Sequence, residues 1–517
     1  MLKPKSSQSS FYGSYLYDKI VPADHLLRKI NQVVDFSFVN DLVKDRYTPD
    51  FGRPAEDPEF MLRLCLLQYL YGDSDRQVEE NASLNLAYKY FLGLAVDEEP
   101  PDYSTVSVFR AIRLGEAKFR QVFEKIVQQC IDKGLVTGRR QIIDSTHIVG
   151  DMAVNSLSGL IKMCRRNVLK SVAGQNSKIA GKLGLNDLQV NKQDRFTRAE
   201  EGLAKEIAEA ETLLDGVARE LNDRNLKVTP ELQKDLELLE KAVADREEGA
   251  KDRLVSPVDP DARMGRKTGK RWAGYKGHVI VEEESEIITA VETTPGNVDD
   301  GTQLKPLLNQ QEEAHDIKPE EISGDKAYDS GANLEHLSGK NITGNISLMG
   351  KNNASGVGFF TVEDFQYDSV NHTLTCPGGC EATHRRHATF HNKRVKRNGA
   401  IFQFSPAQCN CCSLKHQCHK GNRGRTVSIS YYDSYYRKMK ARMESEEGIA
   451  AYRNRYKIEH KVADLARYCG MRYCRYRGLP KARIHTLLSA TVSNIKRMAR
   501  LLWKEPEIPL KSVTAAC

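Results

Sequence analysis

The stretch ISGDKAYDSG, residues 322–331, places the carboxylate of Asp325 directly after a short apolar run that predicts a β-strand. Lys326 follows at once, and a second acid, Asp329, stands a few residues further on. The stretch contains no Gly-rich phosphate loop, no Ser-His pair and no thiol motif. It therefore indicates a strand whose end presents a carboxylate.

Three segments before this strand complete an α/β order. The first, QIIDSTHIVGD (141–151), alternates like a strand and carries Asp144. GHVIVEEESEIITAVETT (277–294) predicts an antiparallel hairpin, and DGTQLKPLLNQQEEAH (300–315) predicts a helix. In the order strand, hairpin, helix, strand, the last strand can lie parallel to the first by a right-handed crossover. We therefore expect Asp144 and Asp325 to be neighbours.

Two carboxylates side by side repel each other, and one of them must keep a proton unless a cation lies between them. A divalent ion such as Mg²⁺ or Mn²⁺ removes this repulsion, because hard cations prefer carboxylate oxygens and keep water as their other ligands. Two such ions about 4 Å apart can bind the attacking and leaving oxygens of a phosphodiester. Asp144 and Asp325 are thus candidate metal ligands, with Lys326 beside the phosphate, although a single Asp at a strand end more often caps a turn.

Positive charge is concentrated near the C-terminus. The chain as a whole has a net charge of +8, whereas residues 451–500 contain 13 Lys and Arg and only two acids, Glu459 and Asp464. This concentration is typical of a protein that binds nucleic acid. The alternative is an ordinary solvated basic helix.

Tyr452, Arg455 and Glu459 are separated by three and then four residues, which on a helix places them on one face. An acid among so many cations weakens binding to DNA unless it has another role, and metal coordination supplies one. Glu459 is therefore the candidate third ligand. The alternative is a glutamate that balances neighbouring arginines by helical pairing.

Taken together, these residues resemble the bacterial insertion-sequence DDE transposases, in the branch with a Tyr-x2-Arg-x3-Glu signature. IIDSTHI and SGDKAYDS are similar to the two Asp segments of that family. In the helical region, SDRQVEENASLNLAYKYFLGL (74–94) and PDYSTVSVFR (101–110) are similar to its N-terminal domain. The family has a basic residue where this chain has Ala466, and Arg467 stands one position later.

The resemblance implies an α/β fold, in which an RNase H-like mixed sheet follows a helical N-terminal domain. It implies a Mg²⁺- or Mn²⁺-dependent transposase that cleaves DNA and transfers the strand, with Asp144, Asp325 and Glu459 as catalytic metal ligands. Double-stranded DNA, as terminal inverted repeats and target, is the implied partner of a homodimer. Lys326, Tyr452, Arg455 and Arg467 are the expected DNA contacts. A nuclease without strand transfer and a non-catalytic DNA-binding regulator are the alternatives.

The chain is long enough for several domains. We expect a helical domain of the DNA-binding type over 1–135, the first part of the core over 136–350, a Cys-rich insertion over 351–440, and basic helices that complete the core over 441–517. Periodicity alone does not separate a helix-turn-helix from a plain bundle in the first domain. An apolar seam inside 155–270 predicts an antiparallel helical hairpin, which could serve as a dimer contact, a DNA-gripping arm or a strut.

Six of the twelve cysteines lie between residues 376 and 418. Cys376, Cys409, Cys412 and Cys418 have a spacing that could supply four thiolates to a structural Zn²⁺, with Cys380 and Cys411 as spare or alternative ligands. An iron–sulfur cluster and unligated thiols are the alternatives.

No run of about 18 uncharged apolar residues occurs, which argues against a membrane span. The first residues, MLKPKSSQSSFYG, lack the apolar core of a signal peptide. We therefore expect a cytoplasmic protein, and the resemblance to bacterial transposases implies that it is associated with the nucleoid.

Overall fold

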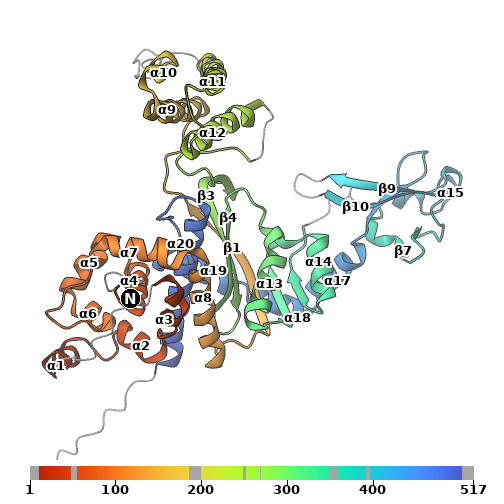
Figure 1. The fold of residues 1–517 in the computed structure, drawn as a ribbon. Coiled ribbons are helices and arrows are strands. Elements are labelled where there is room, and N and C mark those ends of the chain that lie inside the picture. The colour runs from red at the N-terminus through yellow and green to blue at the C-terminus, as the bar shows by residue number, and fades with distance from the viewer. Residues whose placement is uncertain are drawn as a thin grey trace, which may run out of the picture.

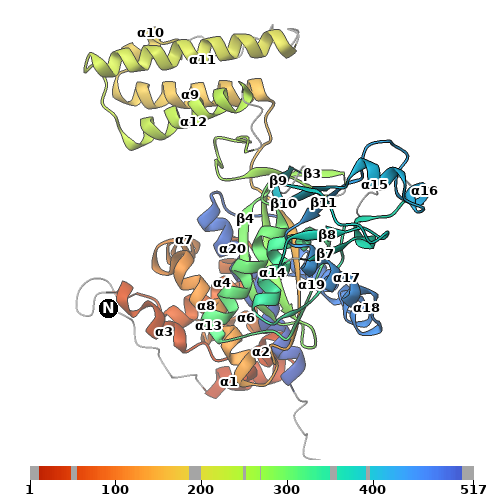
Figure 2. The ribbon, with the colours of Figure 1, turned by 90° about the vertical axis from the view of Figure 1, so that its right-hand side faces the viewer.

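The computed structural model describes residues 11–47, 55–185, 199–247, 252–267, 269–349, 358–368, 370–391 and 396–503. Figure 1 shows a central sheet with helices on both faces, a helical bundle that projects beyond one end of the sheet, and a small β-rich unit on the side away from the N-terminal helices. Figure 2 shows the same bundle standing clear of the sheet in a view turned by 90°. Within the described ranges, no helix has the length and apolar character that crossing a membrane requires.

The central sheet contains β1 (Arg140–Val149), β2 (Arg263–Lys267), β3 (Lys270–Glu282), β4 (Ile288–Pro295), β5 (Glu321–Gly324) and β6 (Thr343–Ile346). β1 is antiparallel to β3 and parallel to β5, and β5 is parallel to β6. β3 forms an antiparallel hairpin with β4 and pairs with β2 at its own N-terminal end. The predicted hairpin and the predicted parallel pairing of the first and last strands are therefore confirmed.

The strands bury both faces of the sheet, as the alternation along β1 illustrates. Ile142 belongs to an apolar core shared with the N-terminal helices, α8 (Gly115–Asp132) and α20 (Leu479–Leu502). Ile143, on the opposite face, belongs to a second core with α13 (Leu304–His315), α14 (Gly331–Gly339) and α17 (Asp433–Glu444). Successive side chains of a strand point to opposite faces, so one strand serves both cores.

The N-terminal region is helical, as expected, with α1 (Phe11–Ile20), α2 (Leu26–Val33), α3 (Phe38–Val43), α4 (Pro58–Tyr71), α5 (Asp75–Leu84), α6 (Leu86–Leu92) and α7 (Tyr103–Val108) before α8. Asp102 caps α7, because its carboxylate accepts a hydrogen bond of 2.8 Å from the amide of Ser104. The helix that starts at this cap does not continue unbroken into α8. A π-helical turn occupies Phe109–Leu114, and Gly115, with φ of 64°, starts α8 in a new direction.

The inserted bundle contains α9 (Leu157–Gln175), α10 (Ser177–Lys182), α11 (Ala199–Asn222) and α12 (Pro230–Glu247). The predicted hairpin is present as α11 and α12, and Thr229 caps α12 by accepting a hydrogen bond of 3.2 Å from the amide of Leu232. α9 was not predicted. Its buried residues, among them Ile161 and Leu169, join the apolar seam of the hairpin in one core, so two helices alone do not account for the insertion.

The Cys-rich insertion contains β7 (Gln366–Asp368), β8 (Thr373–Thr375), β9 (His384–His391), β10 (Lys396–Gln403), α15 (Pro406–Asn410), α16 (Lys415–Cys418) and β11 (Thr426–Ser430). β9, β10 and β11 form an antiparallel sheet that is separate from the central one. After α17, the chain continues through α18 (Glu446–Arg453) and α19 (Tyr456–Tyr468) to α20. The C-terminal helices thus return to the central sheet, where α19 and α20 contact β1 and β4.

Candidate active site

Asp144, on β1, lies at the same level as Asp325, which directly follows the adjacent parallel strand β5. The register pairs Ile142 of β1 with Ser323 of β5, and each aspartate follows its paired residue by two positions. Asp325 starts a single 3-10 turn, Lys326–Tyr328, and its carboxylate accepts a hydrogen bond of 2.8 Å from the amide of Ala327. The expectation that the two aspartates are neighbours is thus met by the strand register.

The surroundings of Asp144 disfavour the ionised form of its carboxyl group. Burial raises the pKa of the Asp144 carboxyl above its ordinary value, and the negative charge of Asp325 raises the pKa further, whereas Lys267 and Arg455 act in the opposite direction. A neighbouring acid that disfavours ionisation is the effect expected for two carboxylates in one site. The aspartates are therefore close enough to repel each other.

Arg455 connects Asp144 to Glu459. Its Nη1 lies 3.3 Å from Oδ2 of Asp144, and its Nη2 lies 2.6 Å from Oε1 of Glu459. Burial lowers the pKa of the Arg455 guanidinium, but nearby negative charges, first that of Asp144, raise the pKa above its ordinary value. A cation thus stands between the buried aspartate and the exposed glutamate.

The expectation that Tyr452, Arg455 and Glu459 share one continuous helix is wrong. Tyr452 lies near the end of α18, Arg455 directly precedes α19, and Glu459 lies in the first turn of α19. The two helices are separated by a tight turn at Asn454 and Arg455, in which the amide of Arg455 donates a hydrogen bond to the carbonyl of Tyr452 at 3.1 Å. The three side chains still lie together, with the Arg455 guanidinium 5.9 Å from the centre of the Tyr452 ring.

The turn between α18 and α19 is anchored to the β3–β4 hairpin through Glu283. Nδ2 of Asn454 donates a hydrogen bond of 2.8 Å to the buried carboxylate of Glu283, and Nζ of Lys457 donates one of 3.2 Å to the Glu283 carbonyl. These contacts hold the residues on either side of Arg455. They therefore determine where its guanidinium meets Asp144.

The three acids do not form a ready-made ligand set. Within the residues that the structure describes, no group of three or more His, Cys, Asp or Glu side chains could hold a metal ion as arranged. Glu459 is exposed, and its carboxylate pairs with Arg455. Lys326 and Arg467, two of the residues expected to contact DNA, are also exposed. The structure thus brings together Asp144 and Asp325, and it joins Glu459 to them through Arg455.

Two residues beside the carboxylates were not predicted from the sequence. Nζ of Lys267, on β2, lies 4.0 Å from Oδ1 of Asp144. The Tyr328 hydroxyl is buried without a hydrogen-bond partner in the described structure, and burial followed by the charges of Asp144, Asp300 and Asp325 raises its pKa. The run of basic residues over 263–271 was the available signal for Lys267. No pattern in the sequence distinguishes Tyr328.

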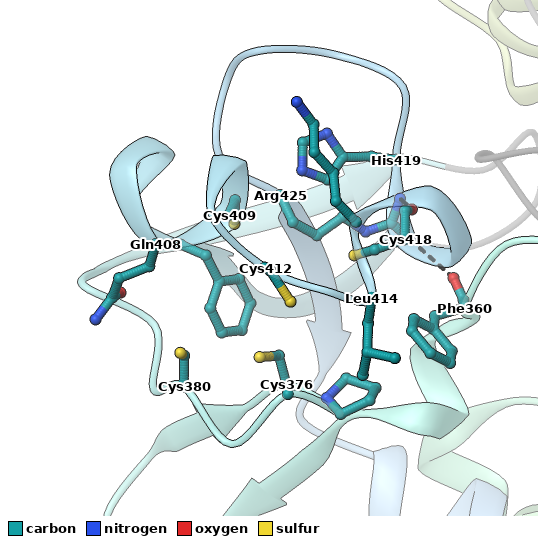
Figure 3. Close-up of a pocket in the computed structure, with 14 residues that line it drawn as sticks. Phe360, Cys376, Cys380, Gln408, Cys409, Cys412, Leu414, Cys418, His419 and Arg425 are labelled. Atoms are coloured by element: carbon teal, nitrogen blue, oxygen red, sulfur yellow. Dashed lines mark hydrogen bonds between the residues drawn. The ribbon is translucent and has the colours of Figure 1, made fainter.

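The four cysteines expected to bind zinc line one cavity in the Cys-rich insertion, and Cys380 joins them. Figure 3 shows Cys376 and Cys380 on one side of this space and Cys409, Cys412 and Cys418 on the other. Burial raises the pKa of the Cys418 thiol, Arg425 opposes this, and the nearby thiols Cys409, Cys376 and Cys412 raise the pKa further. The thiols are therefore close enough to influence one another's charge. As arranged, however, the cysteines among the described residues do not form a group that could hold a metal ion.

Two parts of the chain match known protein families. Residues 15–111 match the model described as a transposase domain (DUF772), and residues 247–495 match the model described as a transposase DDE domain. The second match contains Asp325, Arg455 and Glu459, whereas Asp144 lies before it. No curated protein matches the chain.

Proposed function

We propose, for a chain that belongs to the insertion-sequence DDE transposases, that it cleaves DNA at the ends of its element and joins the new ends to target DNA. The observation that carries the proposal is the β1–β5 register, which sets Asp144, within β1, beside Asp325, directly after β5. Adjacent carboxylates in this position are hard oxygen donors suited to Mg²⁺ or Mn²⁺. Burial raises the pKa of Asp144 and the charge of Asp325 raises it further, which supports a site that is completed by a cation.

Asp144, Asp325 and Glu459 are the proposed metal ligands. The two aspartates fit such a site as they stand, and the unpartnered hydroxyl of Tyr328 borders the same acidic space. Glu459 fits if it leaves Arg455, and its exposed position in the first turn of α19 gives its side chain room to do so. A divalent metal would supply the polarisation of water and phosphate that hydrolysis requires.

Arg455 is the proposed phosphate-binding residue that permits this rearrangement. Its guanidinium already contacts two carboxylates. A DNA phosphate would offer it a third anion, in the bidentate geometry for which arginine is suited. Arg455 would then hold the phosphate beside Asp144 and release Glu459. Tyr452, Lys326 and Arg467 are the further proposed contacts to the DNA backbone.

The proposed reaction has two steps. In the first, water attacks a phosphodiester at the element end, the bond from phosphorus to the 3′ oxygen breaks, and a 3′-hydroxyl and a 5′-phosphate remain. In the second, that 3′-hydroxyl attacks a phosphodiester of the target and displaces the target's own 3′ oxygen. The chain's part in both steps is to align the strand with the same carboxylates.

One assay separates this proposal from the two alternatives. The chain is incubated with duplex DNA that carries the ends of its insertion sequence, together with target DNA and Mg²⁺ or Mn²⁺. Cleaved ends joined to target support the transposase. Cleavage without joining supports a nuclease of the same fold, and DNA binding that needs no metal and leads to no cleavage supports a regulator.

We also propose a structural Zn²⁺ at Cys376, Cys409, Cys412 and Cys418. It is supported by the common cavity that these thiols line, in which Cys380 is a further donor. Thiolates are the donors that structural zinc prefers. The ion would link the turn after β8 to the loop around α15 and α16.

The partners and the domain division follow from the same proposal. Two element ends must be handled together, so we propose a homodimer on double-stranded DNA, acting on terminal inverted repeats and target at the bacterial nucleoid. The division near residues 135, 350 and 440 remains part of the proposal. Its first unit, with helices α1–α8, would be the end-binding domain.

A further inference from the structure

The tip of the β2–β3 hairpin carries four exposed cations, Arg266, Lys267, Lys270 and Arg271, which we call the basic tip. The strand register sets Arg266 directly opposite Arg271 and Lys267 directly opposite Lys270. Like charges directly opposite each other on antiparallel strands destabilise the pair. The basic tip is therefore a local cost to the free hairpin, of the kind that a bound polyanion would remove.

The basic tip is not neutralised from within the chain. Among the described residues, no carboxylate pairs with Arg266, Lys270 or Arg271. Lys267 is the exception, at 4.0 Å from the carboxylate of Asp144. Three cations of the tip are therefore available to a ligand.

The hairpin bends back toward the candidate active site. β3 pairs with β1 only from Gly274 onward, and Gly274 faces Val149 at the end of β1. The basic tip therefore lies outside the part of β3 that pairs with β1. Lys267 nevertheless reaches Asp144, in the middle of β1, and its Nζ lies 3.5 Å from the Ser145 carbonyl. The bend falls at Gly274, where φ is 147° and an added Cβ would lie 2.3 Å from the Ile148 carbonyl oxygen.

The positive charges of Lys267 and Lys270 in the basic tip influence the pKa of His147, which lies near Asp144 on β1. Burial lowers the pKa of His147 to about 4, and Arg472, Lys267 and Lys270 lower it in the same direction. Arg472 also donates a hydrogen bond of 2.8 Å to Nδ1 of His147. Asp144 is thus approached by Lys267 at one carboxylate oxygen and by Arg455 at the other.

We propose that the basic tip is a DNA-binding element that grips the backbone of the duplex next to the phosphate to be cut. The proposal rests on the proposed function and adds a contact surface on β2 and β3, from which Lys267 approaches Oδ1 of Asp144 while Arg455 approaches Oδ2. Arginine and lysine side chains that contact the DNA backbone bind its phosphates irrespective of the base sequence. The ligand is therefore the backbone of double-stranded DNA of any sequence.

The test uses the double variant Arg266→Gln/Arg271→Gln, which leaves Lys267 and its contact with Asp144 in place. The dissociation constant of the full chain for a mixed-sequence DNA duplex is measured by fluorescence anisotropy over a range of salt concentrations, without divalent metal. Each phosphate contact contributes about 0.9 to the slope of log affinity against log salt. We expect the variant to lose about two contacts, so its slope falls by roughly 1.8 and its affinity at low salt decreases.

The matched control is Lys305→Gln/Lys438→Gln, which removes two exposed charges on α13 and α17, outside the proposed end-binding unit. We expect it to keep the wild-type slope. An equal fall in both variants would mean that only total charge matters and would overturn the proposal. A second variant, Arg266→Lys/Arg271→Lys, keeps the charge and is expected to keep the slope.

The outcomes separate this proposal from the one on which it rests. If Arg266→Gln/Arg271→Gln binds DNA with the affinity and salt slope of the wild type, the basic-tip proposal is overturned and the proposed function is left standing. Absence of wild-type binding to any duplex overturns both. Thermal melting guards against misfolding, since relief of like-charge repulsion is expected to leave the melting midpoint of the Gln variant equal to or above that of the wild type. If that variant does not fold, Lys270→Gln is measured instead, with an expected fall in slope of about 0.9.

Discussion

The guanidinium of Arg455 lies 3.3 Å from the buried carboxylate of Asp144, although 311 positions separate the two residues in the chain. The same guanidinium binds Glu459 at 2.6 Å. A protein cation thus lies between two acids that are proposed to share a metal. This contact offsets the cost of burying the charged form of Asp144.

The first prediction concerns stability without metal. Arg455→Ala leaves Asp144 buried beside Asp325 without its cation, and loss of a charged hydrogen bond of this kind costs about 1–3 kcal/mol. We expect the free energy of unfolding, measured by urea denaturation in the presence of a chelator, to fall by that amount. Arg453→Ala, which removes an exposed arginine two residues earlier, is the control and is expected to be neutral. Equal losses in both variants would contradict the assigned contact.

The second prediction concerns metal binding. A ligand that binds only the folded state stabilises it, by about 2.7 kcal/mol at 100 times its dissociation constant. We expect Mg²⁺ or Mn²⁺ to raise the melting temperature of the wild type and to have little effect on Asp144→Asn. The control is Asp151→Asn, at an exposed aspartate further along the same chain segment, which should respond like the wild type. A full response in Asp144→Asn would rule out Asp144 as a ligand.

The third prediction concerns pH and the contact between the N-terminal helices and α20. His485 is fully buried, lies 2.9 Å from the Tyr69 hydroxyl, and has a pKa lowered to about 3 by burial and by Arg475. Because the unfolded chain binds this proton more tightly, the stability due to neutral His485 is complete above the ordinary pKa of 6.5 and is lost as pH falls toward 3.

The variant His485→Gln isolates this effect. Between pH 6.5 and 5, we expect the free energy of unfolding of the wild type to decrease relative to that of the variant by about 1.4 kcal/mol for each pH unit. Denaturant titrations at several pH values measure this difference. A difference that does not change with pH would mean that folding does not lower the pKa of His485.

The fourth prediction concerns the cysteines. We expect the purified chain to contain one zinc ion, measured by atomic absorption, and Cys412→Ser to lose it together with stability of the insertion. Cys411→Ser is a close control, because Cys411 is exposed and does not line the cavity. Equal zinc content in the two variants and the wild type would contradict the assignment of Cys412.

Much of the sheet was predictable because strand order and alternation constrain it. An antiparallel hairpin followed by a helix leaves β5 a place beside β1, and the pairing of Asp144 with Asp325 follows from that order. The cysteine cavity was likewise predictable from spacing, because Cys409, Cys412 and Cys418 lie on one short loop. In both cases, local pattern or simple topology decides the contact.

Contacts that depend on turns were not predictable. The spacing of Tyr452, Arg455 and Glu459 suits a continuous helix, and only the anchoring of Asn454 and Lys457 to Glu283 explains the break. The approach of Lys267 to Asp144 requires the bend at Gly274, which no periodicity reveals. The place of α9, by contrast, was predictable, because Ile161, Cys164, Val168 and Val172 recur at helical spacing along it.

The most direct measurement is the rate of strand cleavage at an element end by Glu459→Gln in Mg²⁺, compared with Asp464→Asn, the other acid of α19, which is also exposed. Loss of residues that only support metal ligands typically costs 10- to 100-fold, so loss of a ligand should cost about 100-fold or more. We predict that Glu459→Gln loses activity on this scale while Asp464→Asn keeps the wild-type rate. Wild-type cleavage by Glu459→Gln would show that this glutamate serves only to pair with Arg455, and the three-carboxylate site would be refuted.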